Sequence, residues 1–395
     1  MSAPVDDLFS QLSRAPDFDA PELRAYDSAD RLLLETAAAV RGSSGFARGV
    51  GALIPGRVVV IGDRHGALTL GAVAVLGAAE VRVHQDPLLA RRALDANARR
   101  LGLEGRYSQH ELDSALLTGA TLVLMQLPRS LSELEQIAWS IARHAEPDVT
   151  VLAGGRDKHM SRGMNDVLSR YFADVSAGLG KRKARVLTAQ SPRPGFDVEE
   201  PPFPVRGSDP ELEFDLAAFG ATFGGATLDH GSRLLLRTLR EDPPGAPPRR
   251  VLDLGCGNGV LATWAARAYA RAEILATDQS AAALAATKLT ATWAGVADRV
   301  RVDHADGTEA VPEGWADIVL LNPPFHSGAI VHAGVGRRLV REAAQALAPG
   351  GELRLVFNSH LAYQSLVSQV VGPVAQLARD RTFTVLRAIK KVTKR

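Results

Sequence analysis

Four consecutive residues near the end of an apolar stretch could hold an amine. Asn322-Pro323-Pro324-Phe325 directly follows residues 317–321, which predict a buried strand. Two prolines cannot continue a sheet, so the chain must leave at the carboxyl edge, where open α/β sheets bind ligands. The carbonyl oxygens of the Asn322 side chain and the Pro323 backbone can accept two N–H bonds, while Phe325 stacks on a ring. The tetrapeptide therefore predicts a site that aims the lone pair of an aromatic amine at an electrophile.

A glycine-rich segment upstream could hold that electrophile. Gly255, Gly257 and Gly259 follow a predicted strand in the pattern G-x-G-x-G. Val260 stands where the dinucleotide fingerprint has its third glycine, which disfavours NAD. S-adenosylmethionine has no pyrophosphate, so such a loop need only pass beneath its amino acid and ribose portions. Together with the tetrapeptide, the loop predicts an S-adenosylmethionine-dependent N-methyltransferase that needs no metal and works mainly by positioning and electrostatics.

Three acids lie within, at the end of, or after the strands around this loop. We expect Asp253 to receive the ammonium group, Asp278 to accept both ribose hydroxyls and Asp306 to contact the adenine amine, although each could instead form a turn or a helix cap. The predicted cofactor-binding residues are Phe223, Asp253, Gly255, Cys256, Gly257, Asn258, Gly259, Asp278, Gln279, Asp306 and Asn322. The predicted catalytic residues are Asn322, Pro323, Pro324 and Phe325.

Two nearby features have simpler interpretations. Cys256 could be a nucleophile, but no obvious histidine base accompanies it, and a small residue suffices between the two glycines. Asp229 and Ser232 could contact the ligand, or they could cap the apolar helix that they begin. For these two residues the pattern leaves both interpretations open.

Alternating strands and helices must position these residues, which predicts doubly wound, mostly parallel sheets in an α/β fold. In the second half, strands are predicted over 250–254, 273–277, 300–303, 317–321 and 351–357, with helices over 260–270, 281–294 and 336–347. The first half repeats the rhythm, with strands over 57–61, 80–84, 121–126 and 149–153 and helices over 87–101 and 130–145. Two similar tandem modules are therefore expected, each Rossmann-like.

The length of 395 residues favours about two domains. Proline is frequent over 191–210 and 242–248, which makes a strand or helix interior improbable there. The predicted organisation is a first domain over 1–190, a linker over 191–207 and a catalytic domain over 208–395. The single cysteine, the absence of a basic-then-apolar start and the absence of a long uncharged apolar run predict a cytoplasmic protein without a membrane span.

The formal net charge of +2 does not by itself imply a polyanionic partner, so local charge must carry that argument. Basic residues gather before the linker and at the end of the chain, where phosphate contacts would give salt-sensitive affinity without sequence choice. The residues predicted to contact RNA are Arg156, Lys158, Lys181, Arg182, Lys183, Lys390 and Lys391. An ordinary solvated surface would account for the same lysines.

The second half resembles the bacterial ribosomal RNA guanine-N2 methyltransferases, and the similarity extends over most of the chain. Beyond the tetrapeptide and the loop, it includes Leu228-Asp229-His230-Gly231-Ser232, the segment 357–363 and a final strand over 383–390. The resemblance implies methyl transfer to the exocyclic N2 of a guanine that is flipped out of its stack. The segments 152–159 and 357–363 look more like the branch that modifies the large subunit.

The same resemblance implies that the first domain is a methyltransferase module that has lost its cofactor and helps to hold RNA. Residues 58–66 lack the G-x-G-x-G loop, and Gln126-Leu127-Pro128-Arg129 stands where the acceptor tetrapeptide would be. Other hypotheses remain open at this point. N-P-P-[FY] also serves enzymes that methylate adenine N6 in DNA or glutamine in proteins, and a ribosome-assembly or RNA-binding factor could keep a vestigial site.

Overall fold

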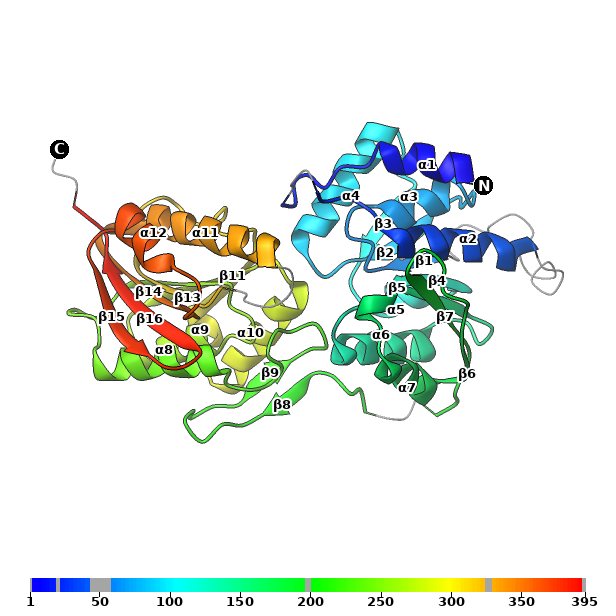
Figure 1. Ribbon diagram of the computed structural model, residues 1–395. Coiled ribbons are helices and arrows are strands. Elements are labelled where there is room, and N and C mark those ends of the chain that lie inside the picture. Colours follow the sequence, from blue (N-terminus) through cyan, green and yellow to red (C-terminus); the bar gives the residue numbers. More distant parts are fainter. Residues whose placement is uncertain (1, 19–21, 43–57, 196–199, 324–328, 393–395) are drawn as a thin grey trace. The chain divides into compact units, whose positions relative to one another are not determined.

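The computed structural model describes residues 2–18, 22–42, 58–195, 200–323 and 329–392. The chain divides into two units, Met1–Phe203 and Pro204–Arg395, here called the N-terminal unit and the C-terminal unit (Figure 1). Each unit contains a seven-stranded, mostly parallel sheet with helices packed against it. The predicted fold class, two tandem Rossmann-like α/β modules, is confirmed.

The N-terminal unit alternates helices and strands as far as its fifth strand. Its strands are β1 (Val58–Ile61), β2 (Val81–His84), β3 (Tyr107–His110), β4 (Leu122–Gln126), β5 (Thr150–Arg156), β6 (Phe172–Ala177) and β7 (Ala184–Pro192). Its helices are α1 (Ser2–Ser10), α2 (Ser28–Gly42), α3 (Ala67–Ala74), α4 (Leu88–Leu101), α5 (Ser114–Leu117), α6 (Leu131–His144), η1 (Asp157–His159) and α7 (Arg162–Tyr171).

The C-terminal unit begins with a separate two-stranded sheet. Its strands are β8 (Val205–Gly207), β9 (Leu216–Ala218), β10 (Arg250–Leu254), β11 (Glu273–Asp278), β12 (Val300–His304), β13 (Ala316–Leu321), β14 (Leu347–Asn358), β15 (Val374–Arg379) and β16 (Phe383–Ile389). Its helices are α8 (His230–Glu241), α9 (Val260–Ala268), α10 (Ala281–Trp293), η2 (Ala297–Arg299), α11 (Ala329–Ala346) and α12 (Tyr363–Val370).

The two large sheets have the same topology. The strand order is β3-β2-β1-β4-β5-β7-β6 in the first and β12-β11-β10-β13-β14-β16-β15 in the second. In each, the first five strands are parallel, and the last two are joined by antiparallel pairs, so that only β7 and β16 run in the opposite direction. In this order β1 corresponds to β10 and β4 to β13, so the paired residues of these strands can be matched between the units.

Alternate residues of the central strands supply two cores, as expected for a sheet that is covered on both faces. In β13, Ile318 and Leu320 belong to the core formed with α8, α9 and α10. Val319 and Leu321 belong to the opposite core, formed with α11 and α12. Figure 1 shows these two helix layers on either side of the sheet. The carboxyl ends of β10 and β13 are thereby fixed side by side, and both strands end at the predicted site.

The proline-rich segment contains the end of one strand and the whole of another. Strand β7 extends through Pro192, which pairs with Phe172 of β6, and β8 occupies 205–207 within the predicted linker. Strand β8 forms an antiparallel pair with β9 of the C-terminal unit. The prolines fall at the ends of these strands rather than in their interiors, so they remove no ladder donor from a central strand. Strands therefore reach into both ends of the predicted proline-rich linker, while the domain bounds 1–190, 191–207 and 208–395 stay a prediction.

The second module has more strands than the six expected, counting the final strand over 383–390, and the first module has more than the four expected. The missing strands include β3, β6 and β15, which lie at sheet edges and are at most half-buried along most of their length. Edge strands face solvent on one side, so their sequences lack the continuous apolar run that marks a buried parallel strand.

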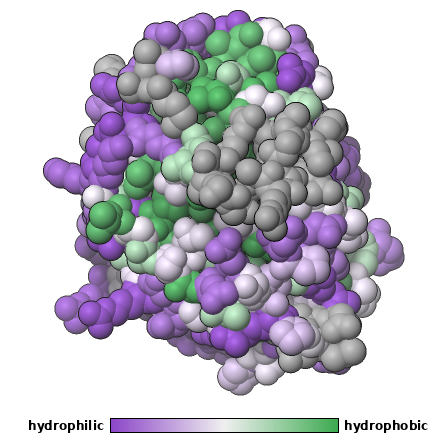
Figure 2. All heavy atoms as spheres, turned by 90° about the vertical axis from the view of Figure 1, so that its right-hand side faces the viewer, coloured by the Kyte–Doolittle hydropathy of each residue, from purple (hydrophilic) through white to green (hydrophobic). Residues whose placement is uncertain are grey.

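The surface is mainly polar. On the face shown in Figure 2, hydrophilic residues cover most of what is visible, and hydrophobic residues gather in smaller areas. Among the described residues, Leu179, Val392 and Phe223 are the most exposed large apolar side chains, at 95%, 68% and 51%. Within the same described segments, no helix combines the length and apolar character required to cross a membrane.

Candidate cofactor and acceptor site

The loop between β10 and α9 combines left-handed backbone with open space. Gly255, Gly257 and Gly259 have φ values of 81°, 56° and 79°, a region that costs side-chain-bearing residues about 1–2 kcal/mol. A Cβ atom at Gly255 or Gly257 would meet no atom within 4 Å, whereas one at Gly259 would lie 2.7 Å from the Thr287 Cα. The first two glycines therefore leave room for a ligand, and the third permits close packing of α10.

Asp278, at the end of β11, shapes this loop. Its Oδ2 accepts a hydrogen bond from the Gly257 backbone N–H at 3.0 Å, and its Oδ1 accepts one from the Ser280 N–H at 2.9 Å. A carboxylate oxygen can accept more than one hydrogen bond. The carboxylate can therefore support the loop and still accept hydroxyl groups, as its predicted role requires.

Asp253 lies beneath the loop and is completely buried. Its Oδ2 accepts a hydrogen bond from the Ala262 N–H at 2.9 Å, whereas its Oδ1 is buried without a partner among the described residues. Burial is the main cause that raises the pKa of Asp253 to about 7; the Ala262 N–H opposes the rise, and the negative charge of Asp278 adds to it. An unpartnered buried oxygen is costly and therefore suits a site that receives a cationic ligand group.

Cys256 is a structural residue. Its side chain is buried and accepts a hydrogen bond from the Thr287 hydroxyl at a distance of 3.2 Å between Oγ1 and Sγ. Burial, followed by the charges of Asp278 and Asp253, raises the pKa of the thiol well above its usual value. A neutral, buried thiol is a poor nucleophile, which agrees with the interpretation based on its size.

Asn258 connects the loop to the segment that precedes α8. Its Nδ2 donates hydrogen bonds to the carbonyl oxygens of Gly225 and Thr227, at 3.0 and 2.9 Å. Phe223, in the same preceding segment, keeps half of its surface exposed. The segment that contains Phe223 therefore reaches the loop through Asn258, while the contact of Phe223 with the cofactor stays a prediction.

Asn322 directly follows β13, the strand next to β10, whose end begins the glycine loop. Leu321 of β13 pairs with Leu254 of β10, so Asn322 and Gly255 leave the sheet at adjacent positions. The Nδ2 of Asn322 donates to Ser232 Oγ at 3.0 Å and to Asp229 Oδ1 at 3.2 Å. Its Oδ1 is buried and accepts no hydrogen bond from the described residues.

The rest of the predicted acceptor tetrapeptide is only partly covered by the structure. Pro323 follows Asn322 directly and is buried. Pro324 and Phe325 lie outside the described residues. The predicted stacking of Phe325 on a base therefore stays a prediction.

Asp306 has a strong partner inside the protein. Both of its carboxylate oxygens accept hydrogen bonds from Arg338, each at 2.7 Å, in a bidentate ion pair. This pair lines a hollow of about 470 Å³ together with Glu342. To contact adenine, the Asp306 carboxylate would have to accept a hydrogen bond from the adenine amine while it also accepts two from Arg338. The predicted role therefore depends on the lone pairs that Arg338 does not use.

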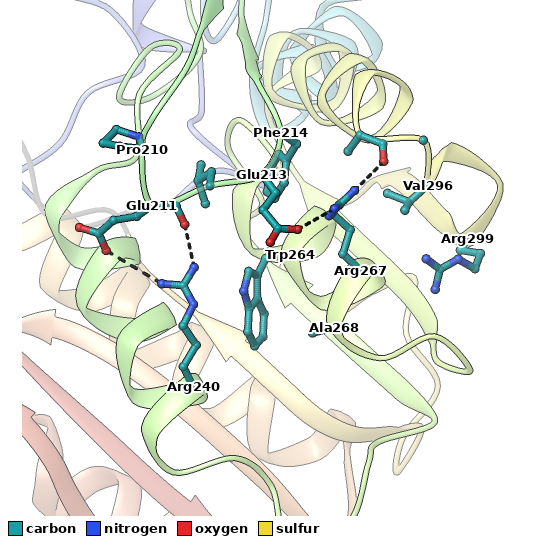
Figure 3. A pocket seen from close by; sticks show the side chains of 13 residues that line it. Pro210, Glu211, Glu213, Phe214, Arg240, Trp264, Arg267, Ala268, Val296 and Arg299 are labelled. Atoms are coloured by element: carbon teal, nitrogen blue, oxygen red, sulfur yellow. Dashed lines mark hydrogen bonds and ion pairs between the residues drawn. The ribbon is translucent and has the colours of Figure 1, made fainter.

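A larger hollow of the C-terminal unit, about 640 Å³, belongs to the opposite edge of the sheet (Figure 3). It is lined by residues at the ends of α8, α9 and α10, which approach the amino ends of the strands because these helices run antiparallel to them. Arg267 pairs with Glu213 at 2.8 Å, and Arg240 donates to the Glu211 carbonyl at 2.9 Å (Figure 3). Arg299 also lines this hollow, and its Nη1 is buried without a hydrogen-bond partner among the described residues. The hollow receives no role in the predicted chemistry.

Comparison with known proteins covers both units. The family model described as Methyltransferase small domain matches residues 213–387, and the model described as RLMG N-terminal domain matches residues 3–193. Ribosomal RNA large subunit methyltransferase G of Pseudomonas syringae pv. syringae is 34% identical, over 96% of this chain and 97% of its own length. The protein of the same name from Streptomyces avermitilis is 33% identical with the same coverage.

The chain belongs to the ribosomal RNA large subunit methyltransferase G family. The predicted family, including its large-subunit branch, is therefore confirmed.

A solved structure extends the likeness of this methyltransferase G family member to the whole fold. The structure of the T. thermophilus 16S rRNA N2 methyltransferase RsmC, in complex with AdoMet and guanosine, aligns with a TM-score of 0.73 and 21% sequence identity. The alignment covers 98% of this chain and 99% of that one. It supports two tandem methyltransferase-like units.

The residues of the methyltransferase G chain fit S-adenosylmethionine. The loop offers open space at Gly255 and Gly257, and Asp253 presents an unpartnered buried oxygen beneath it. Gln279 is exposed directly after Asp278, and its carbonyl oxygen lies 2.8 Å from His304 Nε2. Among the described residues, no group of three or more His, Cys, Asp or Glu side chains could hold a metal ion.

Some of the basic residues predicted to contact RNA already form ion pairs within the protein. Lys181 and Arg182 form ion pairs with Glu35, at 2.6 and 2.9 Å. Arg182 and Lys183 have φ values of 54° and 61° in the hairpin between β6 and β7. A phosphate would have to compete with Glu35 for the first two cations.

The remaining basic residues lie after β5 and near the C-terminus. Arg156 is half-buried, while Lys158 is exposed and forms no ion pair within the described part of the chain. Lys390 donates to the Leu347 carbonyl at 2.6 Å, and Lys391 is exposed. Lys158 and Lys391 are thus better placed than Lys181 or Lys390 for the predicted phosphate contacts.

Two interactions of the site were not predicted from the sequence. The contacts of Asp229 and Ser232 with Asn322 join residues 93 and 90 positions apart, and capping explained both residues well enough on its own. Thr287, which contacts both Cys256 and Gly259, lies inside a helix and carries no motif. The motif around Asp229 was the one available signal for the first interaction.

Proposed function

We propose that this chain transfers the methyl group of S-adenosylmethionine to the exocyclic N2 of a guanine in large-subunit ribosomal RNA. One observation carries the proposal: the amide oxygen of Asn322, directly after the strand beside the glycine loop, is buried and unpartnered. A carbonyl acceptor at the edge of a cofactor loop is what an aromatic amine requires. The names of the relatives support the large subunit as the source of the RNA.

The cofactor would be held by residues around the loop, with Asp253 and Asp278 supplying negative charge and Gly255 and Gly257 supplying space. When bound, S-adenosylmethionine supplies an electrophilic methyl group on a sulfonium. The Asn322 Oδ1 and the Pro323 carbonyl then accept the two N–H bonds of the guanine amine and direct its lone pair. The proton is lost to water, so no metal and no dedicated base is needed.

The N-terminal unit has a separate proposed role. At the register position of Asn322 it carries Gln126, and at that of Gly257 it carries Arg64 with a φ of 62°. We propose that this unit binds no S-adenosylmethionine and contacts RNA phosphates instead, with Lys158 among the contacting residues. The proposed substrate also favours a cytoplasmic location, where ribosomes assemble.

The decisive experiment measures methyl transfer to ribosomal RNA from a strain that lacks the corresponding gene. Isotope-labelled cofactor and mass analysis of nucleosides should reveal N2-methylguanosine in large-subunit RNA. Label in DNA, in protein or only in small-subunit RNA would contradict the proposed substrate. No binding of S-adenosylmethionine by the native protein would contradict the proposed activity and favour an assembly factor.

We expect Asn322→Ala to reduce turnover about a hundredfold or more, because it removes a preorganised acceptor, while the affinity for S-adenosylmethionine stays close to native. Calorimetry measures that affinity, with Asp278→Ala as the control that should lose it. Equal loss of cofactor binding in Asn322→Ala would contradict the role of Asn322.

A further inference from the structure

The first turn of α8 holds the amide group of Asn322 in one orientation. The Asn322 Nδ2 donates to the Asp229 carboxylate and to the Ser232 hydroxyl, which both belong to the start of this helix. The same Asp229 Oδ1 accepts the Ser232 backbone N–H at 3.0 Å as the N-cap of α8. One carboxylate thus fixes both the helix end and the amide.

An inverted amide would be unfavourable at this position. Rotation by 180° about the last side-chain bond would place the Asn322 oxygen against the Asp229 carboxylate, which has no proton to donate. The amide oxygen would then lose its place at the site, and the amide N–H groups would face the acceptor instead. A donor cannot accept the N–H bonds of an incoming amine, so the orientation decides whether the site can work.

Gly231 packs closely against the Asn322 amide group and limits its movement. A Cβ atom at this residue would lie 3.3 Å from Asn322 Oδ1 and 3.4 Å from Nδ2, closer than most Cβ contacts. The backbone of the first turn of α8 therefore packs directly against the amide plane. Hydrogen bonds set the direction of the amide, and Gly231 sets its position.

We propose that Asp229 and Ser232 are positioning residues that direct the Asn322 carbonyl oxygen toward the acceptor amine. This inference rests on the proposed function, because it assumes that Asn322 accepts the N–H bonds of the amine. It goes beyond helix capping, since a cap needs no contact with the strand. It also predicts an effect on turnover rather than on cofactor affinity.

The N-terminal unit contains a matching contact that serves as a control. Gln126, at the register position of Asn322, donates through Nε2 to Asp30, the third residue of α2, as Ser232 is of α8. The contact between the preceding helix and the fourth strand is therefore common to both units. If it only stabilised the fold, its loss would have equivalent consequences in the two units.

The test uses two variants that keep the helix cap. Serine is as good an N-cap as aspartate but too short to reach the amide, so Asp229→Ser should fold normally. Ser232→Ala removes only the hydroxyl contact. For each we expect kcat to fall about ten- to a hundredfold, the usual effect of losing a hydrogen bond to a charged or preorganised group, with unchanged affinity for S-adenosylmethionine. Gln126→Ala should leave kcat unchanged.

Combination with Asn322→Ala separates positioning from stability. If Asp229 acts through Asn322, then Asp229→Ser should cause no further loss of kcat in the Asn322→Ala background. Asp229→Asn retains a side-chain oxygen as acceptor and should recover part of the activity. Additive losses in the double variant, or a kcat of both single variants equal to native, would overturn the inference.

The same set of variants distinguishes failure of the inference from failure of the proposed function. Full activity of Asn322→Ala would remove the proposed role of Asn322 and the function built on it. Inactive Asn322→Ala together with fully active Asp229→Ser and Ser232→Ala would overturn the positioning role alone. Thermal unfolding and cofactor binding, measured for every variant, exclude loss of folding as the cause of any difference.

Discussion

At the residue scale, two glycines of the same loop should fail in different ways when a side chain is added. A Cβ atom at Gly257 points into open space, whereas one at Gly259 would lie 2.7 Å from the Thr287 backbone. We expect Gly257→Ala to weaken S-adenosylmethionine binding at a stability cost of about 1–2 kcal/mol, set by its left-handed backbone. Gly259→Ala should cost more stability. Calorimetry and urea unfolding of both variants separate the two effects.

The N-terminal unit provides the sharper version of this test. Arg64 occupies the position of Gly257 with almost the same φ, 62° against 56°, which shows that the turn tolerates a long side chain. Gly257→Arg should therefore fold and lose cofactor binding altogether. Native affinity in this variant would contradict the location of the cofactor site.

Asp253 should make stability depend on pH. Its pKa is about 7 in the folded chain against an ordinary value of 3.8, so the folded chain keeps a proton that the unfolded chain releases. The contribution is full below about pH 4 and is lost as the pH rises toward 7, by about 1.4 kcal/mol per unit crossed. Urea unfolding of Asp253→Asn should lack this part of the slope seen in the native protein.

A bound cation would change that slope. If the ammonium group of S-adenosylmethionine contacts Asp253, saturating cofactor should lower the pKa of this carboxyl and flatten the slope of the native protein. Asp253→Asn should show no such change. An unchanged native slope would contradict the predicted contact.

Individual site residues were predictable where a motif combined chemistry with position. Asp278 and Asn322 each follow an apolar strand directly, so parallel pairing brought their ends to one edge. Asp253 illustrates the limit: its buried location beneath the loop depends on the packing of α9, which no local pattern encodes. The Arg338 partner of Asp306 comes from a helix 32 residues later, and only the folded chain brings the two together.

At the scale of elements, a buried ion-pair network anchors α8, the helix that contacts Asn322. Arg354 of β14 is fully buried, pairs with Glu352 and donates to the Asp242 carbonyl at 2.6 Å. We expect Arg354→Met to cost about 3–5 kcal/mol in unfolding free energy, because Glu352 would be left buried without its partner. Glu352→Gln in that background should recover part of the loss. Urea denaturation measures both, and a neutral single variant would contradict this account.

Among the strands, the sequence pattern predicted those that are buried along most of their length. Central strands such as β10 and β13 are short, mainly apolar and mostly buried, and their predicted bounds agree with the structure within a residue. Helix α3 was not predicted, because it is buried nearly all round and therefore lacks an amphipathic period. Strand β3, with the sequence YSQH, lacks an apolar run altogether.

At the scale of the whole molecule, we expect a small number of exposed basic residues to provide most of the electrostatic affinity for RNA. Lys158 is exposed. Burial, followed by the positive charges of Arg129 and Lys158, lowers the pKa of the neighbouring His159. We expect Lys158→Gln to weaken RNA binding and to reduce the slope of log affinity against log salt by about 1. Lys181→Gln should do less, because Lys181 pairs with Glu35. Filter binding at several salt concentrations compares them, and equal slopes for all three proteins would contradict the contact.

The tandem architecture was visible in the sequence because both halves repeat the same alternation of strands and helices. The loss of the glycine loop in the first half was visible too. The near-identical course of the two turns was not, because Gly62-Asp63-Arg64-His65-Gly66 shares only its first and last glycine with the second loop. Equivalent backbone hydrogen bonds hold the two turns although their sequences differ. The N–H groups of Gly62 and Gly255 each donate to a carbonyl of the neighbouring strand, at 3.0 and 2.8 Å.

The shared turn has a consequence for turnover. Because it forms in a unit that lacks the cofactor-binding acids, its shape belongs to the fold and should exist before any ligand arrives. Every predicted contact of the turn is with the amino acid or nucleoside portion, and the demethylated by-product retains both. The by-product should therefore compete with fresh cofactor on nearly equal terms, and the working rate inside a cell would depend on how quickly another enzyme clears it away.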